Sequence, residues 1–261
     1  MEYTKRSVLL ALLMFSFNIC CAENVTQTNA TDHSVDQIQL DELHDDLFAD
    51  IEDDLGLDEI QEVYDPLEPM NRAIFWFNDK IYFLVMRPVK RAYRVVPEPV
   101  RISVANFFSN LASPIRFINA GLQLKFEDAG NELIRFVVNT TVGIAGLFDP
   151  ANKYMGIRQK QEDFGQTLGY YGADSGFYIV LPVLGPSNVR DTLSLPVDYL
   201  LDPVLYIVDD DFDRIGVYSV DIINDLSIDK DTYETIKRES LDPYTTFKNA
   251  YEQSRKGKIE K

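Results

Sequence analysis

The chain has 261 residues, a formal net charge of −17 at pH 7 and a hydrophobic content of 46%. That apolar content is ample for a core, whereas the acidic balance argues against nucleic-acid binding. All cysteines and histidines, namely Cys20, Cys21, His33 and His44, precede residue 65. The rest of the chain therefore lacks the residues for a disulfide, a thiolate or imidazole metal site, and a Ser-His-Asp or Cys-His centre. We expect no cofactor, no metal and no enzymatic activity.

Residues 1–22 have the layout of an export signal. Lys5 and Arg6 precede an apolar run that ends at Ile19, and Cys20 and Cys21 follow. The pattern leaves two outcomes open, which are cleavage after residue 22 and lipidation of Cys20 or Cys21. The residues before both cysteines are bulkier than a good lipidation site requires.

Residues 23–64 form an acidic segment that contains Asp and Glu but neither Lys nor Arg. Its first part is rich in Thr, Asn and Gln and predicts a disordered arm. Leu43, Leu47, Ile51 and Leu55 then recur at helical spacing, which predicts a weak acidic helix. This helix either docks on a basic partner or serves as a solvated spacer.

Residues 65–94 predict a helix with an unusual composition. Asp65, Pro66 and Glu68 have the spacing of an N-cap, an N1 proline and an N3 carboxylate, so we expect the helix to begin there. Apolar and aromatic side chains cover nearly all of its faces, and its only interruption is the polar run at residues 78–80. The helix is too apolar for an ordinary surface and too interrupted to span a membrane.

A basic cluster ends this helix. Arg87, Lys90, Arg91 and Arg94 share an arc of roughly 100° on the helical wheel. Two interpretations are open: a buried core helix with a solvated basic end, or a lipid-facing helix whose basic residues bind headgroups.

Further short helices are expected at residues 100–111, 113–124 and 126–148, each with an apolar face. The stretch from Phe136 to Phe148 is uncharged but shorter than the roughly 20 residues that a bilayer span needs. Glycines are dense from residue 143 to 185, and residues 177–181 permit a strand.

Asp-Pro pairs at residues 149, 202 and 242 predict three more helix starts. Apolar spacing predicts helices around residues 215–226 and 244–251. The chain therefore predicts a mainly α fold of about seven to nine short helices.

Three motifs in this order resemble the MlaA (VacJ) family of outer-membrane phospholipid-transport lipoproteins. They are DPLEPMNRAIFWFND from residue 65, FGQTLGYYGADSGFYIVLPVLGPSNVRD from residue 164, and ESLDPYTTFKNAY from residue 239. The resemblance implies a single ring-like domain over residues 65–255, followed by a basic tail at 256–261. Its short amphipathic helices would lie in the membrane, at the periplasmic face of the outer membrane.

The resemblance also implies a function without bond chemistry. Such a protein removes mislocalised phospholipid from the outer leaflet through an amphipathic channel and passes it to a soluble periplasmic lipid-binding protein. A trimeric porin is the expected scaffold. The alternative is a structural envelope adaptor that binds a porin or periplasmic partners without conducting lipid.

By position, the resemblance implies a set of residues at the channel and its gate. They are Asn71, Trp76, Phe77, Asn78, Phe136, Gly143, Ile144, Gly146, Leu168, Gly169, Tyr171, Leu181, Pro182, Arg190 and Asp191. The apolar members would guide acyl chains, and Arg190 and Asp191 would admit the headgroup. For these last two a structural ion pair is the competing interpretation, and for each glycine it is close packing.

Overall fold

The computed structural model describes residues 63–260. The predicted export signal, the two cysteines and nearly all of the acidic arm lie outside the described residues, and the domain limits stay predictions. In order, the elements are α3 (Glu68–Ile81), the π-helix η1 (Tyr82–Met86), α4 (Arg87–Tyr93), α5 (Glu98–Leu111), α6 (Ser113–Leu122), α7 (Phe126–Thr141), α8 (Pro150–Met155), α9 (Phe164–Tyr170), β1 (Tyr178–Leu181), β2 (Gly185–Asn188), α10 (Val189–Leu201), α11 (Val204–Ile207), α12 (Asp211–Ile228), α13 (Thr232–Glu239) and α14 (Pro243–Ile259). The predicted mainly α class is confirmed.

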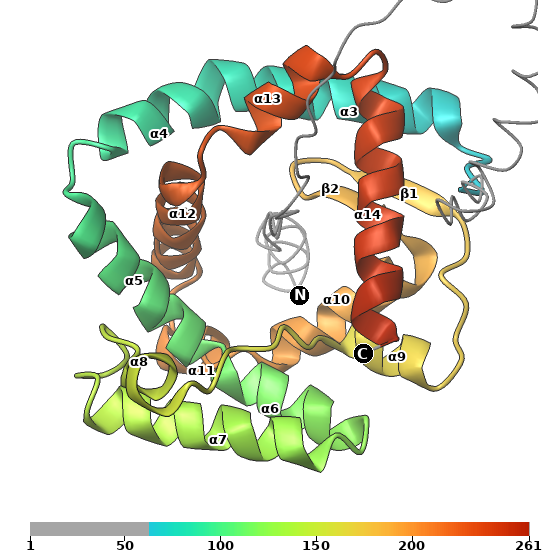
Figure 1. Ribbon diagram of the computed structural model, residues 1–261. Coiled ribbons are helices and arrows are strands. Elements are labelled where there is room, and N and C mark those ends of the chain that lie inside the picture. The colour runs from blue at the N-terminus through green and yellow to red at the C-terminus, as the bar shows by residue number, and fades with distance from the viewer. Residues whose placement is uncertain (1–62, 261) are drawn as a thin grey trace, which may run out of the picture. The chain divides into compact units, whose positions relative to one another are not determined.

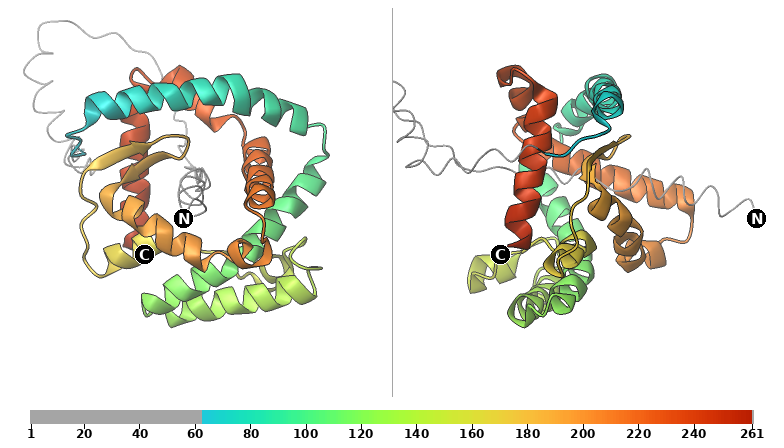
Figure 2. Two further views of the ribbon diagram at one scale, coloured as in Figure 1. Left: turned by 180° about the vertical axis from the view of Figure 1, so that it is seen from behind. Right: turned by 90° about the vertical axis from the view of Figure 1, so that its right-hand side faces the viewer.

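The helices of this part of the chain are arranged around a closed circuit (Figure 1). The segment from α3 to α4 forms one side, α5 the next, α6 and α7 the third, and α14 the last (Figure 1). Helix α12 is seen end-on in Figure 1 and lengthwise in the right view of Figure 2, so it crosses the plane of the circuit. Strands β1 and β2 form an antiparallel hairpin beside α3, with Tyr178 opposite Asn188 and Leu181 opposite Gly185.

The first helix begins later than the sequence predicts. Helix α3 starts at Glu68, and its N-cap, Leu67, provides no side-chain hydrogen bond. The carboxylate of Asp65 instead accepts hydrogen bonds from the Asn71 side chain and the Tyr244 hydroxyl. The Asp65 carboxylate, which the local pattern assigns to the N-cap, therefore bonds to side chains and does not cap the helix. From Glu68 the chain stays helical to Tyr93 through the π-helical segment η1.

Helix α7 is shorter than expected. It ends at Thr141, and residues 142–148 turn back, with positive φ angles of 55° at Ile144, 55° at Ala145 and 88° at Gly146. A Cβ atom at Gly143 would lie 2.5 Å from the carbonyl oxygens of Asn139 and Phe148, so the turn requires glycine there. Periodicity alone did not reveal this reversal.

Other local predictions are confirmed. The strand expected at residues 177–181 is β1, and the side chains of Asp149 and Asp242 cap α8 and α14. Asp202 accepts a hydrogen bond from the backbone of Val204 at the start of α11. The described part of the chain has more helices than predicted, because α9, α10 and α13 were not expected from the sequence.

The interior of the described part is mostly polar. Buried polar or charged residues outnumber buried hydrophobic ones by more than two to one, and the main apolar cluster is small: Tyr82, Tyr233 and Phe247. Many large apolar side chains are exposed instead. Folded soluble proteins show the reverse tendency, so the apolar surface needs a purpose other than packing. In residues 63–260, no helix combines the length and apolar character needed to cross a membrane.

Candidate functional site

The three family-like motifs meet in space where the circuit closes. The start of α3 contacts the N-cap of α14, where Arg72 forms a bidentate pair with Asp242. The distance from Nη2 to Oδ2 is 2.7 Å, and that from Nη1 to Oδ1 is 3.1 Å. Asp65 accepts a hydrogen bond from the Tyr244 hydroxyl and lies 3.6 Å from Lys248 Nζ. We call this contact region the closing junction, and it extends from residues 65–79 through the hairpin and α9–α10 to α14.

Two predicted gate residues hold the hairpin against α3. Asn71 is fully buried; its Nδ2 donates to the Tyr178 carbonyl over 3.0 Å, and its Oδ1 accepts from the Val180 amide over 2.9 Å. Two helical turns later, Asn78 Nδ2 donates to the Leu181 carbonyl over 2.9 Å, and its Oδ1 accepts from the Val183 amide over 2.7 Å. Each amide side chain thus pairs with the backbone as a neighbouring strand would, because its NH2 group donates and its carbonyl oxygen accepts.

The aromatic residues between these asparagines are more exposed. Trp76 is 61% exposed and Phe77 is 46% exposed, whereas Asn71 is at 0%. The same helix therefore presents polar amides to the hairpin and apolar rings elsewhere. The four predicted gate residues on α3 therefore have different surroundings. Asn71 and Asn78 bond to the hairpin, whereas the side chains of Trp76 and Phe77 are exposed.

A charged network joins α9, α10 and α14. Arg255 of α14 donates to both carboxylate oxygens of Asp163, over 2.6 and 2.9 Å, and to Asp191 Oδ1 over 2.8 Å. Tyr251 donates to Asp191 Oδ2 over 2.6 Å, and Arg190 Nε to Asp191 Oδ1 over 3.1 Å. Burial alone would raise the pKa of Asp163, but the hydrogen bonds and charge of Arg255 lower it to about 2. Arg190 and Asp191 are both buried in this network, which supports the structural ion pair over a headgroup contact.

Close packing explains two of the motif's glycines. A Cβ at Gly165 would lie 2.5 Å from Asp191 Oδ1 and 2.7 Å from Arg255 Nη2. A Cβ at Gly169 would lie 2.6 Å from Ile259 Cδ1 and 2.9 Å from Arg190 Nη1. These glycines, four residues apart on α9, therefore leave room for the charged network.

Gly165→Ala should destabilise the protein by about 1–3 kcal/mol, because the new methyl group displaces a buried ion pair. Gly130→Ala is the matched control, because a Cβ there meets nothing within 4 Å in the middle of α7. Alanine should stabilise that helix by up to about 1 kcal/mol. Denaturant unfolding of both variants measures the difference. Equal effects would contradict the packing role of Gly165.

The other glycine-bearing region lies elsewhere in the circuit. Residues 142–148 follow α7, where Asn110 donates to Thr140 and Asn139 donates to Asp149, each over 2.9 Å. The turn exposes apolar side chains, with Val142 at 69%, Ile144 at 62% and Phe148 at 55%. Phe136 is half-buried on α7. Gly143, Ile144 and Gly146 thus belong to an exposed apolar turn, and Phe136 lies on the helix that precedes it; both are separate in the fold from the closing junction (Figure 1).

Several predicted residues lie at the edges of these regions. Leu181 ends β1, Pro182 begins the turn of the hairpin, and Leu168 is half-buried on α9. Tyr171 is 64% exposed, and its hydroxyl donates to the Leu122 carbonyl over 2.5 Å. The predicted set is therefore distributed around the circuit.

The basic cluster is not a uniform exposed patch, which corrects the prediction for Lys90. Lys90 is 1% exposed; its Nζ donates to the Tyr82 hydroxyl over 2.8 Å and lies 2.9 Å from Asp231. Arg94 also pairs with Asp231, and Arg87 lies 3.5 Å from Glu234. Within residues 63–260, Arg91 is the one member of the cluster that is exposed and makes no ion pair with the acidic residues around α13. The acidic residues lie about 140 positions away, so local sequence could not reveal this burial.

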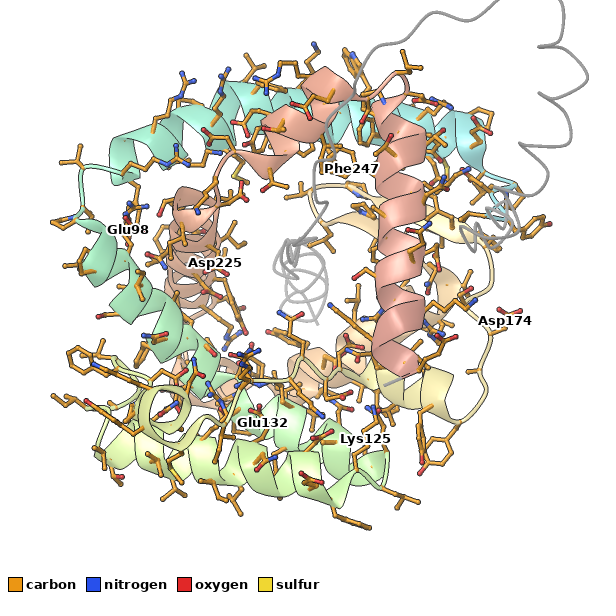
Figure 3. The ribbon with its side chains drawn as sticks, viewed as in Figure 1. Glu98, Lys125, Glu132, Asp174, Asp225 and Phe247 are labelled. Carbon is orange, nitrogen blue, oxygen red and sulfur yellow. The ribbon has the colours of Figure 1, made fainter. Side chains whose placement is uncertain are left out.

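Sequence analysis also missed the polar contacts between α6, α7 and α8. Glu132 of α7 points toward α6 (Figure 3), where Arg116 Nε donates to its Oε2 over 2.9 Å. Arg135 donates to Asp149 Oδ2 over 3.0 Å. Burial dominates the lowered pKa of Arg116, although Glu132 opposes it. The three-residue spacing of Glu132 and Arg135 was the only local signal, and it also fits an ordinary surface pair.

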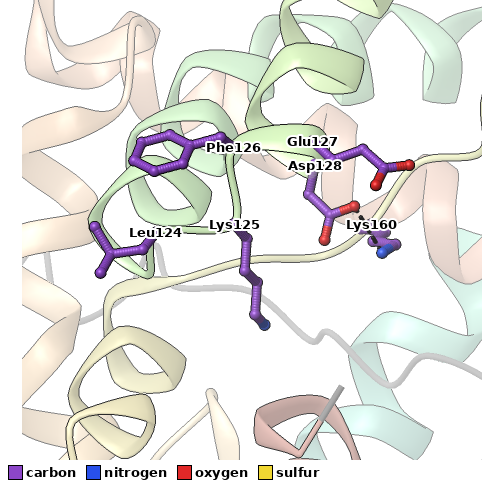
Figure 4. A pocket seen from close by; sticks show the side chains of 6 residues that line it. All are labelled: Leu124, Lys125, Phe126, Glu127, Asp128 and Lys160. Atoms are coloured by element: carbon purple, nitrogen blue, oxygen red, sulfur yellow. Dashed lines mark ion pairs between the residues drawn. The ribbon is translucent and has the colours of Figure 1, made fainter.

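A shallow pocket lies at the turn between α6 and α7 (Figure 4). Its volume is about 390 Å³, and its lining consists of Leu124, Lys125, Phe126, Glu127, Asp128 and Lys160. Lys160 pairs with Asp128 over 2.7 Å, and Lys125 pairs with Glu162 over 3.3 Å. None of the predicted channel residues lines it.

Comparison with known proteins identifies the family. The family model described as MlaA lipoprotein matches residues 63–258. An intermembrane phospholipid transport system lipoprotein MlaA of Haemophilus influenzae is 31% identical over 205 residues, which cover 77% of this chain and 81% of the relative. An uncharacterized protein of Rickettsia felis is 37% identical over 201 residues, covering 76% and 79%.

A solved structure gives the same result for the fold. It is described as the structural basis for maintenance of bacterial outer membrane lipid asymmetry, and its chain is 32% identical to this one. The TM-score is 0.67, and the match covers 75% of this chain and 98% of that chain. The motifs, the helical circuit and the comparisons agree, and the chain belongs to the MlaA lipoprotein family.

Proposed function

We propose that this protein removes mislocalised phospholipid from the outer leaflet of the outer membrane and passes it to a soluble periplasmic lipid-binding protein. It does so without enzymatic chemistry, from the periplasmic face of that membrane, with a trimeric porin as scaffold. The domain for this work is residues 65–255, preceded by an export signal and an acidic arm.

The observation that carries the proposal is the arrangement of polar and apolar residues. Charged networks such as Arg255–Asp163–Asp191 hold the helices together, and many large apolar side chains are exposed. Helices with this distribution can lie in a membrane interface with their apolar faces buried roughly 5–10 Å deep. The uncharged turn at residues 142–148 and the exposed rings of Trp76 and Phe77 provide the surfaces for acyl chains.

Ile144→Asp should reduce the phospholipid that co-purifies with the full chain from detergent. The substitution places a charge in an uncharged apolar turn, and aspartate tolerates the left-handed backbone of residue 144. Phe212→Asp is the matched control, because Phe212 is 80% exposed but lies among four aspartates at residues 209–213. The measurement is moles of phospholipid per mole of protein, together with phospholipid exposed on cells that carry each variant.

Three results would count against the proposal. They are wild-type protein without bound phospholipid, equal loss in both variants, and unchanged surface phospholipid in cells that lack the protein. Release of free fatty acid by the pure protein would instead indicate a lipid hydrolase.

A further inference from the structure

The turn of the β1–β2 hairpin contains a strained residue. Pro182, Val183 and Leu184 connect the two strands, and Val183 has a φ of 68°. A β-branched residue rarely adopts this left-handed conformation, and such residues persist only where the surroundings hold them. The last pair of the hairpin ladder is Leu181 opposite Gly185, so the three turn residues lie beyond the ladder.

Asn78 provides the contacts that hold this turn. Its Oδ1 accepts from the Val183 amide over 2.7 Å, and its Nδ2 donates to the Leu181 carbonyl over 2.9 Å. The strained residue and the side chain that holds it are therefore directly bonded. Loss of this contact would free Val183 to return to an ordinary backbone conformation.

The other end of the hairpin is anchored much more firmly. Asn71 is fully buried and bonds to Asp65 as well as to Tyr178 and Val180. Asn78, in contrast, is only half-buried, and its side chain bonds to Leu181 at the end of β1 and to Val183 in the turn. This asymmetry makes the Asn71 end a fixed pivot and the Asn78 end the place where the hairpin separates from α3.

We propose that residues 182–184 form a flap that Asn78 latches onto α3, and that strain at Val183 favours its opening. The opened flap presents the half-buried side chains of Val183 and Leu184 to an acyl chain. The lipid part of this inference rests on the proposed function. The latch itself rests only on the contacts and the backbone conformation described above.

Two substitutions should change the flap in opposite directions. Asn78→Ala removes the latch, so exchange of the Val183 amide hydrogen should become about tenfold faster, the factor that one typical hydrogen bond carries. Val183→Asn keeps the amide and the latch but tolerates the left-handed conformation. Exchange at residue 183 should then become about fivefold slower, at the lower end of what relief of one strained residue brings.

The measurement is hydrogen–deuterium exchange at single amides of the full chain in detergent. Asn106→Ala is the control for loss of an asparagine, because Asn106 bonds to Leu147 far from the hairpin in the sequence. Leu124→Asn is the control for relief of strain, because Leu124 has a φ of 60° in another turn. Neither control should change exchange at residue 183. Changes in the same direction for Asn78→Ala and Val183→Asn would contradict the latch.

A second measurement tests the link to lipid. Fluorescent phosphatidylethanolamine is followed from donor to acceptor vesicles of phosphatidylethanolamine and phosphatidylglycerol in the presence of each protein. Asn78→Ala should accelerate the transfer and Val183→Asn should slow it. Equal transfer rates despite opposite exchange effects would overturn the role of the flap in lipid movement. If the wild-type protein transfers no lipid, the proposed function fails, and the exchange rates still decide whether the latch exists.

Discussion

Arg255→Ala should lower the free energy of unfolding by about 3–5 kcal/mol, the usual cost of removing one partner from a buried ion pair. Arg255 donates to Asp163 and Asp191, so its loss leaves two carboxylates without their main cation. Arg190 contacts only Asp191 of these two and cannot replace it. We expect the closing junction to loosen between α9 and α14.

The pH dependence of this variant follows from the sign of the Asp163 shift. The wild-type pKa is lowered to about 2, so the ion pair stabilises the fold above the ordinary pKa of 3.8 and is lost as the pH falls toward 2. Without Arg255 the pKa of Asp163 should rise, so acidification should partly rescue the variant. Its deficit should be largest at pH 7 and smaller at pH 4.

Chemical denaturation at these two pH values measures the effect. Arg238→Ala is the matched control, because Arg238 and Glu239 form an exposed pair with side chains 72% and 65% accessible. Such a pair contributes little to stability, so Arg238→Ala should change the free energy of unfolding by less than about 0.5 kcal/mol. A similar loss in both variants would show that Arg255 is not a central contact.

Asp198→Asn should stabilise the protein at pH 8 by about 2–4 kcal/mol. Asp198 is 3% exposed, and burial, followed by the charge of Asp163, raises its pKa to about 7. Hydrogen bonds from the Phe164 amide and the Asn119 side chain only partly oppose that rise. Asparagine keeps an oxygen acceptor for both donors and carries no charge.

The pH dependence expected at Asp198 is opposite to that at Asp163, whose pKa is lowered by Arg255. Because the folded pKa of Asp198 is raised, its stabilising contribution is complete below pH 4 and is lost as the pH rises through 7. The variant should therefore match the wild type near pH 4 and exceed it at pH 8. Asp174→Asn, at an exposed loop position, should show no such difference between the two pH values. Thermal or denaturant unfolding at both pH values decides between these outcomes.

Local features of the fold could be predicted from local sequence. The Asp149 and Asp242 caps were evident because an N-cap bonds within three residues of itself. The same reasoning misplaced the start of α3, since Asp65 bonds to Tyr244 instead. Local sequence thus predicts that a helix forms. Whether a given aspartate caps that helix depends on partners far away in the sequence.

The candidate site shows the same division. The motifs contain Asn71, Asn78 and Gly165, but a single sequence could not separate packing from lipid contact. Packing could be assigned only from three-dimensional contacts. The two asparagines bond to the backbone of the hairpin, and Gly165 lies against the ion pair of Asp191 and Arg255. Burial of Lys90 was also hidden, because its partners Asp231 and Glu234 follow much later in the chain.

Closure of the helical circuit has a consequence for the order of folding. Asp65 and Tyr244 are 179 residues apart in sequence, and their hydrogen bond joins the first and last parts of the described chain. Contacts of such long range form slowly, because chain entropy must be lost before they contribute. Separate pieces such as α6 with α7 can form early from local contacts. The circuit itself can close only after α14 has been synthesised, so we expect its closure to be a late step of folding.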